Sequence, residues 1–169
     1  MSEQAITQTQ AFRHALGQFA TGITVVTTCA PDGSPCGVTA SSFNSVSLDP
    51  PMVLWSLGRQ ALSMAAFAAA EHFTVHVLAA DQQALSNRFA SRGSDKFAGL
   101  AWTRDAHGVP LLSGCAAVFR CRTAHRYDGG DHVIFVGEVV GFEGADCPPL
   151  LFHGGRYAAL QPQQQPAMA

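Results

Sequence analysis

Two long strand-like stretches joined by a tight turn place the strongest constraint on the fold of this chain. Residues 116–127 and 132–142 are rich in β-branched and aromatic side chains, and Asp-Gly-Gly-Asp at 128–131 separates them. Glycine and aspartate in so short a connection are typical of β-hairpin turns. The two stretches therefore predict a long antiparallel hairpin. A doubly wound parallel sheet is disfavoured because helices would have to separate its strands.

Shorter segments extend this pattern to the rest of the chain. Runs of β-branched and apolar residues predict further strands, at 23–28, 36–42, 52–57 and 73–78, and a final segment at 150–160. Segments rich in alanine or with apolar residues at helical spacing predict helices, at 12–20, 61–70 and 82–90. We expect a mainly β (α+β) protein, a β-barrel with peripheral helices. One domain should cover residues 9–160, with flexible tails at 1–8 and 161–169.

The charge balance narrows the possible partners. Only 13% of the residues are charged, the net charge is −2, and Lys96 is the single lysine. Because no basic stripe is present, nucleic acid is not an expected partner. The low charge predicts an apolar surface that a homo-oligomer would cover. The longest apolar runs are too short for a membrane span, so no membrane association is expected.

The cysteines and the N-terminal residues indicate a cellular compartment. The five cysteines form no Cys-x-x-Cys pair, and they are Cys29, Cys36, Cys115, Cys121 and Cys147. This pattern favours reduced thiols over disulfides, and no metal site is expected. The first ten residues lack the basic start and apolar core of a signal peptide. We therefore expect a cytoplasmic protein.

A hydroxyl-rich run at 37–51 is the first candidate binding segment. Its hydroxyls come from five side chains, Thr39, Ser41, Ser42, Ser45 and Ser47. Small polar residues let a backbone approach a ligand closely, so the run could hold a polar or planar small molecule. The same hydroxyls could equally cap local backbone groups at a strand edge. The residues alone leave both interpretations open.

Further candidates are scattered along the chain. Ser56, Arg59 and Ser63 flank a predicted strand–helix junction, where they could hold a phosphate or simply cap the helix. Cations lie beside aromatic rings in Asn-Arg-Phe at 87–89 and Asp-Lys-Phe at 95–97, where they could bind a phosphate or line a ring. In isolation a solvated helix face with two core phenylalanines is favoured. His132, which ends Gly-Asp-His in the long hairpin, could contact a substrate or be simply an exposed residue beside the turn.

Motifs of several common enzyme classes are missing. The chain has no Gly-x-Gly-x-x-Gly after a strand, no P-loop, no His-Glu-x-x-His and no Gly-x-Ser-x-Gly. It therefore offers no obvious nucleophile or metal-bound water. This favours chemistry performed by a bound cofactor that the protein positions.

Five segments, taken in order, resemble the short-chain flavin reductase family, the small components of two-component flavin-dependent monooxygenases. They are FRHALGQFATGITVVTT (12–28), GVTASSFNSVSLDPPMVLWSL (37–57), RFASRGSDKF (88–97), GGDHVIFVGEV (129–139) and PLLFHGGRY (149–157). The resemblance covers residues 12–160 and is strongest to reductases that serve aromatic-ring and steroid-ring hydroxylases. It implies an FMN-binding split β-barrel that forms a homodimer and binds FMN or FAD at the subunit interface.

The resemblance also implies roles for individual residues. Those expected along the ribityl chain are Val38, Thr39, Ala40, Ser41 and Ser42. Those expected beside the isoalloxazine ring are Ser45, Val46 and Ser47. Those expected toward the flavin phosphate are Ser56, Leu57, Arg59, Ser63, Arg88 and Phe89. Those expected to face NADH or NADPH are His132, as the catalytic residue, with Gly155, Arg156 and Tyr157.

The implied activity is NAD(P)H:flavin oxidoreduction that supplies reduced flavin to a partner monooxygenase. Hydride transfer between two stacked rings needs orientation rather than a protein nucleophile. One alternative is a pyridoxamine-phosphate-oxidase-like flavoenzyme, against which the single lysine counts. Another is a flavin-binding carrier or sensor without NADH turnover.

Overall fold

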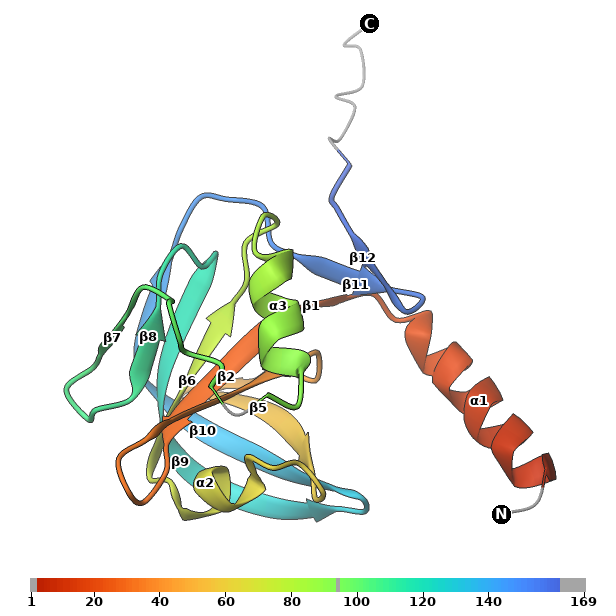
Figure 1. Ribbon diagram of the computed structural model, residues 1–169, viewed down its shortest axis with the longest axis horizontal. Helices are drawn as coiled ribbons and strands as arrows, with labels where there is room; N and C mark the ends of the chain where they lie inside the picture. The colour runs from red at the N-terminus through yellow and green to blue at the C-terminus, as the bar shows by residue number, and fades with distance from the viewer. Residues whose placement is uncertain (1–2, 94, 162–169) are drawn as a thin grey trace, which may run out of the picture.

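A strongly curved antiparallel sheet with helices on its outside makes up the computed structural model, which describes residues 3–93 and 95–161 (Figure 1). The helices are α1 (Glu3–Gly17), α2 (Met64–Ala69) and α3 (Gln83–Ala90). This architecture confirms the predicted β-barrel with peripheral helices. Most of the predicted C-terminal tail, residues 162–169, lies outside the described residues, as do residues 1–2 of the predicted N-terminal tail.

Seven strands form the main sheet. In spatial order they are β3 (Pro35–Ala40), β2 (Thr24–Cys29), β6 (His72–Val77), β9 (Ala117–Gly129), β10 (His132–Gly144), β5 (Pro51–Gly58) and β4 (Asn44–Leu48). The two edge strands, β3 and β4, are joined through residues 41–43. The sheet therefore curls into a barrel that stays open between its edges, which is a split barrel.

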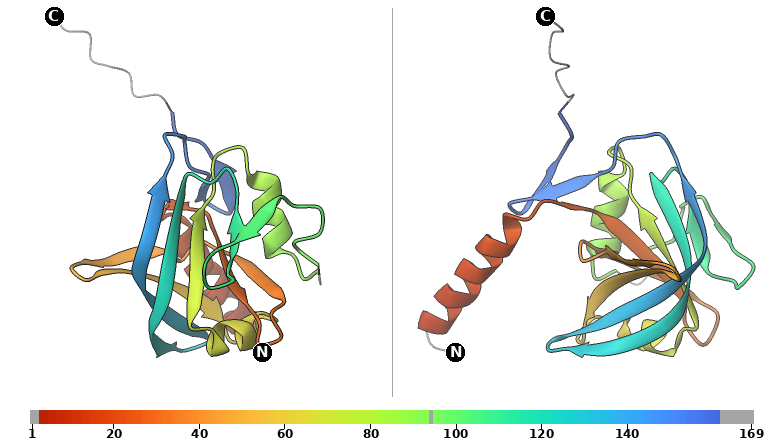
Figure 2. Two further views of the ribbon diagram at one scale, coloured as in Figure 1. Left: turned by 90° about the vertical axis from the view of Figure 1, so that its left-hand side faces the viewer. Right: turned by 180° about the vertical axis from the view of Figure 1, so that it is seen from behind.

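Two small sheets complete the fold. One contains β1 (Thr21–Gly22), β11 (Leu151–His153) and β12 (Arg156–Ala158), and the other contains β7 (Trp102–Arg104) and β8 (Pro110–Leu112). The first sheet and α1 project away from the barrel, as the right-hand view of Figure 2 shows. No helix in residues 3–93 and 95–161 combines the length and hydropathy needed to cross a membrane.

The predicted long hairpin is the centre of the main sheet. β9 and β10 each contain 13 residues, and Gly129 pairs with His132 across the turn. Gly130 has a φ of 75°, a conformation that side chains with a Cβ rarely adopt. This turn fixes the register of β9 and β10, and the pairing of β10 with β5 on its other side places His132 opposite Gly58.

Aromatic side chains fill the barrel. Trp55 stacks on Phe135 with ring centroids 4.9 Å apart and meets Phe67 edge-on at 4.8 Å. All three side chains are almost completely buried. A second cluster, which includes Phe89 and Phe97, lies beneath α3. Burying one such aromatic side chain stabilises the fold by about 2–3 kcal/mol relative to leaving it exposed.

Three features differ from the sequence-based expectation. Helix α1 begins at Glu3, whereas the sequence predicted a start near Phe12. The first turns of this helix show no apolar periodicity, so the sequence pattern did not reveal them. Strand β4 occupies part of the hydroxyl-rich run, where Val46 forms a bulge between Ser45 and Ser47. A bulge and exposed serines hide the alternation by which strands are recognised. The short β7–β8 hairpin was also not predicted.

Gly137 of β10 provides a test of the packing. A Cβ at this position would lie 2.5 Å from Cζ of Phe73 and 2.9 Å from Cβ of Cys121, both buried. Gly137→Ala should therefore destabilise the fold by about 1–3 kcal/mol and lower Tm by roughly 3–10 °C. Gly144→Ala is the control, because nothing lies within 4 Å of its Cβ. Equal melting temperatures for the two variants would contradict this packing.

Candidate functional site

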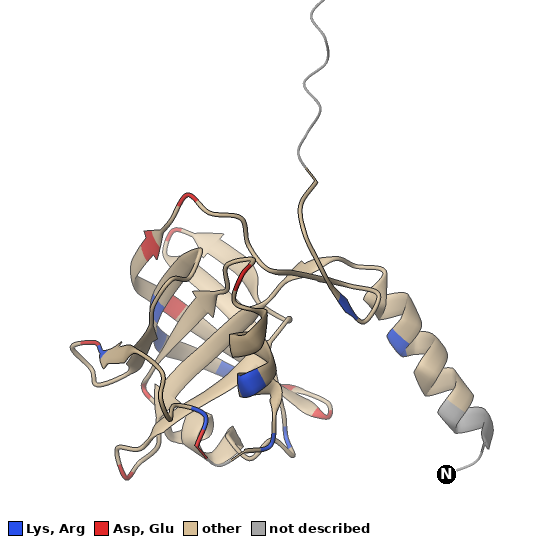
Figure 3. Cartoon of the chain, turned by 45° about the horizontal axis from the view of Figure 1, so that its top comes forward, with Lys and Arg blue, Asp and Glu red and all other residues tan. Residues whose placement is uncertain are grey.

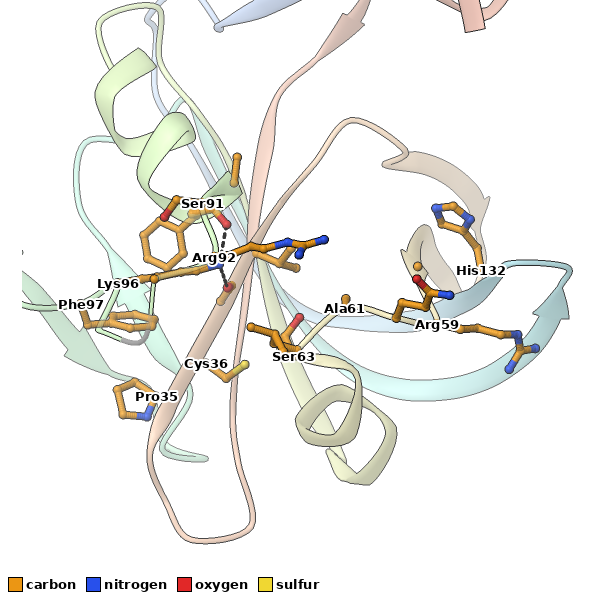
Figure 4. A pocket seen from close by; sticks show the side chains of 18 of the residues that line it. Pro35, Cys36, Arg59, Ala61, Ser63, Ser91, Arg92, Lys96, Phe97 and His132 are labelled. Atoms are coloured by element: carbon orange, nitrogen blue, oxygen red, sulfur yellow. Dashed lines mark hydrogen bonds between the residues drawn. The ribbon is translucent and has the colours of Figure 1, made fainter. Parts of the chain in front are cut away.

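A cleft of about 960 Å³ opens on one side of the barrel (Figure 4). Four segments line it: the start of β3 (35–38), the β5–α2 connection (58–63), the residues after α3 (89–93, 96 and 97) and the β9–β10 turn (131 and 132). Its volume lies at the upper end of the range for small-molecule sites. The cleft is therefore large enough for a nucleotide.

Two cations, Lys96 and Arg92, lie at one end of the cleft and differ in their hydrogen bonding. Lys96 Nζ donates to the carbonyl oxygens of Phe89 at 2.7 Å and Gly37 at 3.4 Å, so it fastens the end of α3 to β3. Burial lowers the pKa of Lys96, opposed by the nearby Cys36 thiol. Arg92 is exposed, and no hydrogen bond or ion pair joins it to another described residue. Figure 4 shows its guanidinium extending into the cleft.

His132 lies at the opposite end, on the β9–β10 turn. Its Nδ1 is 2.7 Å from Oδ1 of Asp131. This contact lowers the pKa of the Asp131 carboxyl, chiefly through the hydrogen bond and also through the charge of the imidazole. A Cβ added to Gly58 would lie 3.7 Å from His132 Nε2, so the ring lies beside a glycine. The cleft thus separates a free guanidinium from an imidazole.

Cations are scattered over the rest of the molecule. Figure 3 shows Lys and Arg interspersed with Asp and Glu over the barrel. Several arginines are paired, for example Arg122 with Glu138 between β9 and β10. Exposed pairs of this kind contribute little to stability. A cation that faces the cleft without a partner is therefore the distinctive one.

The predicted flavin-binding residues divide between the cleft and the barrel wall. The cleft lining contains four of them, Val38, Arg59, Ser63 and Phe89. Ala40 and Leu57 are buried in the core. The remaining predicted residues do not line this cleft, and they are Thr39, Ser41, Ser42, Ser45, Val46, Ser47, Ser56 and Arg88.

Two hydroxyls of the hydroxyl-rich run have structural partners. Thr39 Oγ1 donates to the carbonyl oxygen of Ser86 at 2.6 Å, which attaches α3 to β3. Ser42 Oγ accepts from the amide of Ser56 at 2.9 Å and donates to its carbonyl at 3.2 Å. These bonds link the segment after β3 to β5. Both hydroxyls thus bond backbone groups of segments distant in sequence, rather than capping backbone groups next to them.

The β11–β12 hairpin lies away from the cleft. Gly155 has a φ of 78° in its turn, and Arg156 is exposed. The hydroxyl of Tyr157 donates to Oδ1 of Asn87 at 2.7 Å and is 2.9 Å from Ser86 Oγ. Within one chain these predicted nicotinamide-facing residues do not join His132.

The sequence-based assignment gave no role to most of the residues that line the cleft, and these include Cys36, Gln60, Arg92 and Lys96. Lys96 was weighed as a candidate beside Phe97 but received no role. Arg92 lies inside the segment 88–97 that carries the family resemblance, so the signal was present. Arg88 is on α3, whereas Arg92 follows the C-terminal end of this helix and lines the cleft.

Fold and cleft together describe a split-barrel protein with a nucleotide-sized site, and comparisons with known proteins specify the family. The family model "Flavin reductase like domain" matches residues 16–161. The chain belongs to this family. It is 48% identical over 154 residues to the FMN reductase (NADH) SmoA of Agrobacterium fabrum, covering 91% of this chain and 87% of that protein.

Two other relatives illustrate the range of the family. The reductase component of a flavin-dependent trigonelline monooxygenase from Acinetobacter baylyi is 43% identical over 93% of this chain, which spans only 51% of that protein. The NADH:FAD oxidoreductase of Streptomyces globisporus, solved with NAD and FAD fragments, has a TM-score of 0.89 and 37% identity. That match covers 94% of this chain and 96% of the solved one.

The donor set of the cleft fits a phosphorylated flavin. Arg92 offers an unpaired guanidinium, and Ser63 and Ser91 line the same space. Guanidinium groups bind phosphate oxygens in bidentate fashion. The cleft also has apolar walls that include Ala61 and Leu62. A polar anion site beside apolar surface is what a ring system carrying a phosphate requires.

Proposed function

We propose that this protein is an NADH:flavin oxidoreductase that reduces FMN or FAD in the cleft between Arg92 and His132. The observation that carries the proposal is this cleft in a chain of the flavin reductase family, with a free cation at one end and an imidazole at the other. The names of the relatives support NADH as the reductant.

The residues of the chain supply binding and orientation. When bound, the flavin accepts the hydride that reduced nicotinamide donates. Arg92 holds the phosphate, the apolar walls exclude water, and His132 hydrogen-bonds the nicotinamide-bearing substrate. Holding two reactants in alignment accounts for several kcal/mol of barrier reduction without a covalent intermediate. The reduced flavin then serves a partner monooxygenase, as proposed from the relative that is a monooxygenase reductase component.

NADH consumption in air, measured against added flavin, tests this function. The purified protein should oxidise NADH with a rate that saturates in FMN or FAD and vanishes without added flavin. A carrier or sensor would bind flavin without consuming NADH. An oxidase of the pyridoxamine-phosphate type would consume that amine in the absence of NADH. Either of these results would overturn the proposed activity.

Replacing Arg92 tests the phosphate site. Arg92→Ala should weaken FMN binding about tenfold to a hundredfold, because a charge-assisted hydrogen bond is lost. Riboflavin, which lacks the phosphate, should bind the variant and the wild type equally. Flavin fluorescence titration measures both affinities. A parallel loss for FMN and riboflavin would show that Arg92 does not contact the phosphate.

We also infer that the protein works as a homodimer in the cytoplasm. Phe12, Leu16 and Phe19 are 64%, 59% and 74% exposed along the side of α1 and just beyond it. Exposed apolar stripes of this kind favour association, and α1 projects from the barrel as an arm (Figure 2). A second copy could bring its β11–β12 hairpin toward the cleft. All five cysteines are free thiols, which supports a reducing compartment.

Sedimentation velocity checks the dimer. The wild type should sediment as a species of twice the chain mass, whereas the double variant Phe12→Asp/Leu16→Asp should sediment as a monomer with unchanged barrel circular dichroism. A wild type that remains monomeric at high concentration would exclude a stable dimer.

A further inference from the structure

Arg59 forms an unusual set of contacts for a residue expected at the flavin phosphate. Its Nε donates to the carbonyl oxygen of Gly130 at 2.8 Å, and its Nη2 pairs with the carboxylate of Asp128. Its backbone amide donates to the carbonyl oxygen of Asp131 at 2.9 Å. Side chain and backbone thus both bind the β9–β10 turn.

The held turn is the one that carries His132. The turn residues are exposed, and the side chains of Asp128 and Asp131 are 80% and 93% accessible. The backbone near the turn is held by the hairpin bonds, by the pairing of His132 with Gly58, and by Arg59. Asp131 in turn contacts the His132 imidazole. Arg59 therefore acts on the histidine through the backbone of this turn.

The same contacts remove Arg59 from the phosphate role. Two of its N–H groups are already committed, one to the carbonyl oxygen of Gly130 and one to the carboxylate of Asp128. Arg92 lines the same cleft with no such partner. A phosphate would bind the unpaired guanidinium, because no existing bond has to be broken.

We propose that Arg59 is a positioning residue that fixes the β9–β10 turn and thereby holds His132 at the end of the cleft, and that it is not a ligand of the flavin phosphate. The proposal rests on the proposed function, since it assigns His132 to the nicotinamide side. It predicts that Arg59 affects the use of NADH and leaves phosphate recognition unchanged.

Three arginine variants separate this role from the alternatives. Arg59→Ala should raise the KM for NADH about tenfold, whereas the ratio of FMN to riboflavin affinity should stay within about twofold of the wild type. Arg59→Lys should restore part of the lost NADH affinity, because its ammonium group can bond one of the two partners but lacks the planar guanidinium that bonds both. Arg104→Ala is the matched control, since Arg104 bonds the carbonyl oxygens of Gly33 and Gly108 away from the cleft. It should leave the KM for NADH unchanged.

A double variant tests whether the effect runs through the histidine. In the background of His132→Ala, adding Arg59→Ala should change the KM for NADH by less than about twofold, because the residue it positions is gone. Amide hydrogen exchange at residues 130–132 should be faster in Arg59→Ala than in the wild type, a readout that needs no turnover.

The outcomes that contradict the proposal are distinct. If the ratio of FMN to riboflavin affinity fell well below the wild-type ratio in Arg59→Ala, Arg59 would be identified as a ligand of the phosphate. An unchanged KM for NADH, or unchanged exchange at the turn, would show that Arg59 does not position His132. If wild-type protein consumes no NADH, the proposed function fails, and the exchange and affinity measurements still decide the role of Arg59.

Discussion

Replacing His132 by alanine is expected to lower kcat/KM for NADH by about a hundredfold, whereas the Kd for FMN should change less than about threefold. His132 is on the cleft end opposite Arg92, where Asp131 orients its ring. Loss of an orienting contact near the reacting atoms costs on the order of a hundredfold in rate. Stopped-flow reduction and flavin titration give the two quantities separately.

His125→Ala is the matched control for this variant. His125 lies on β9 and stacks on Tyr127 with ring centroids 5.5 Å apart, and it does not line the cleft. Its replacement should leave both quantities unchanged. If His132→Ala reduced FMN affinity as much as NADH use, the histidine would have to be moved to the flavin side of the site.

Acidification from about pH 6.5 to pH 4 should cost about 3 kcal/mol of unfolding free energy through His76 alone. His76 is completely buried, and burial lowers its pKa to about 4. Its Nδ1 lies 3.1 Å from the carbonyl oxygen of Val25, and its Nε2 accepts from the amide of Leu112 at 3.1 Å. These partners select the neutral ring with its proton on Nδ1.

The sign follows from proton binding. The unfolded chain protonates His76 near pH 6.5, whereas the folded protein keeps it neutral until about pH 4. The unfolded state therefore binds more protons in this window, and stability falls as the pH falls. Urea unfolding of the wild type and His76→Gln at several pH values isolates the contribution, because other titrating groups are common to both. Parallel stability curves between pH 6.5 and 4 would contradict the buried neutral histidine.

The sequence predicted the elements whose signals are local. The Asp-Gly-Gly-Asp turn at 128–131 specifies the β9–β10 hairpin by itself, because glycine at a positive φ and a two-residue connection leave little choice of register. From the same hairpin, the position of His132 at an exposed turn could be predicted. Its place at the end of a cleft could not, because it depends on pairing with β5 from a distant part of the chain.

Residue type alone could not distinguish a binding group from a structural one. Thr39 and Ser42 have the hydroxyls that a ligand would use, yet their partners are the backbones of Ser86 and Ser56, 47 and 14 residues away in sequence. Arg59 likewise has a guanidinium suited to phosphate, and its Nε bonds the carbonyl oxygen of Gly130, 71 residues away. Long-range partners decide such roles, and a single sequence does not reveal them.

The reduction of excess flavin without oxygen tests the central claim most directly. NADH is added anaerobically to a small amount of protein and a large excess of FMN, and the absorbance of oxidised flavin is followed. We expect one FMN to be bleached for each NADH, with many FMN molecules reduced per protein chain. Bleaching that stops at one flavin per chain, or no bleaching at all, would contradict a reductase that supplies reduced flavin to a partner.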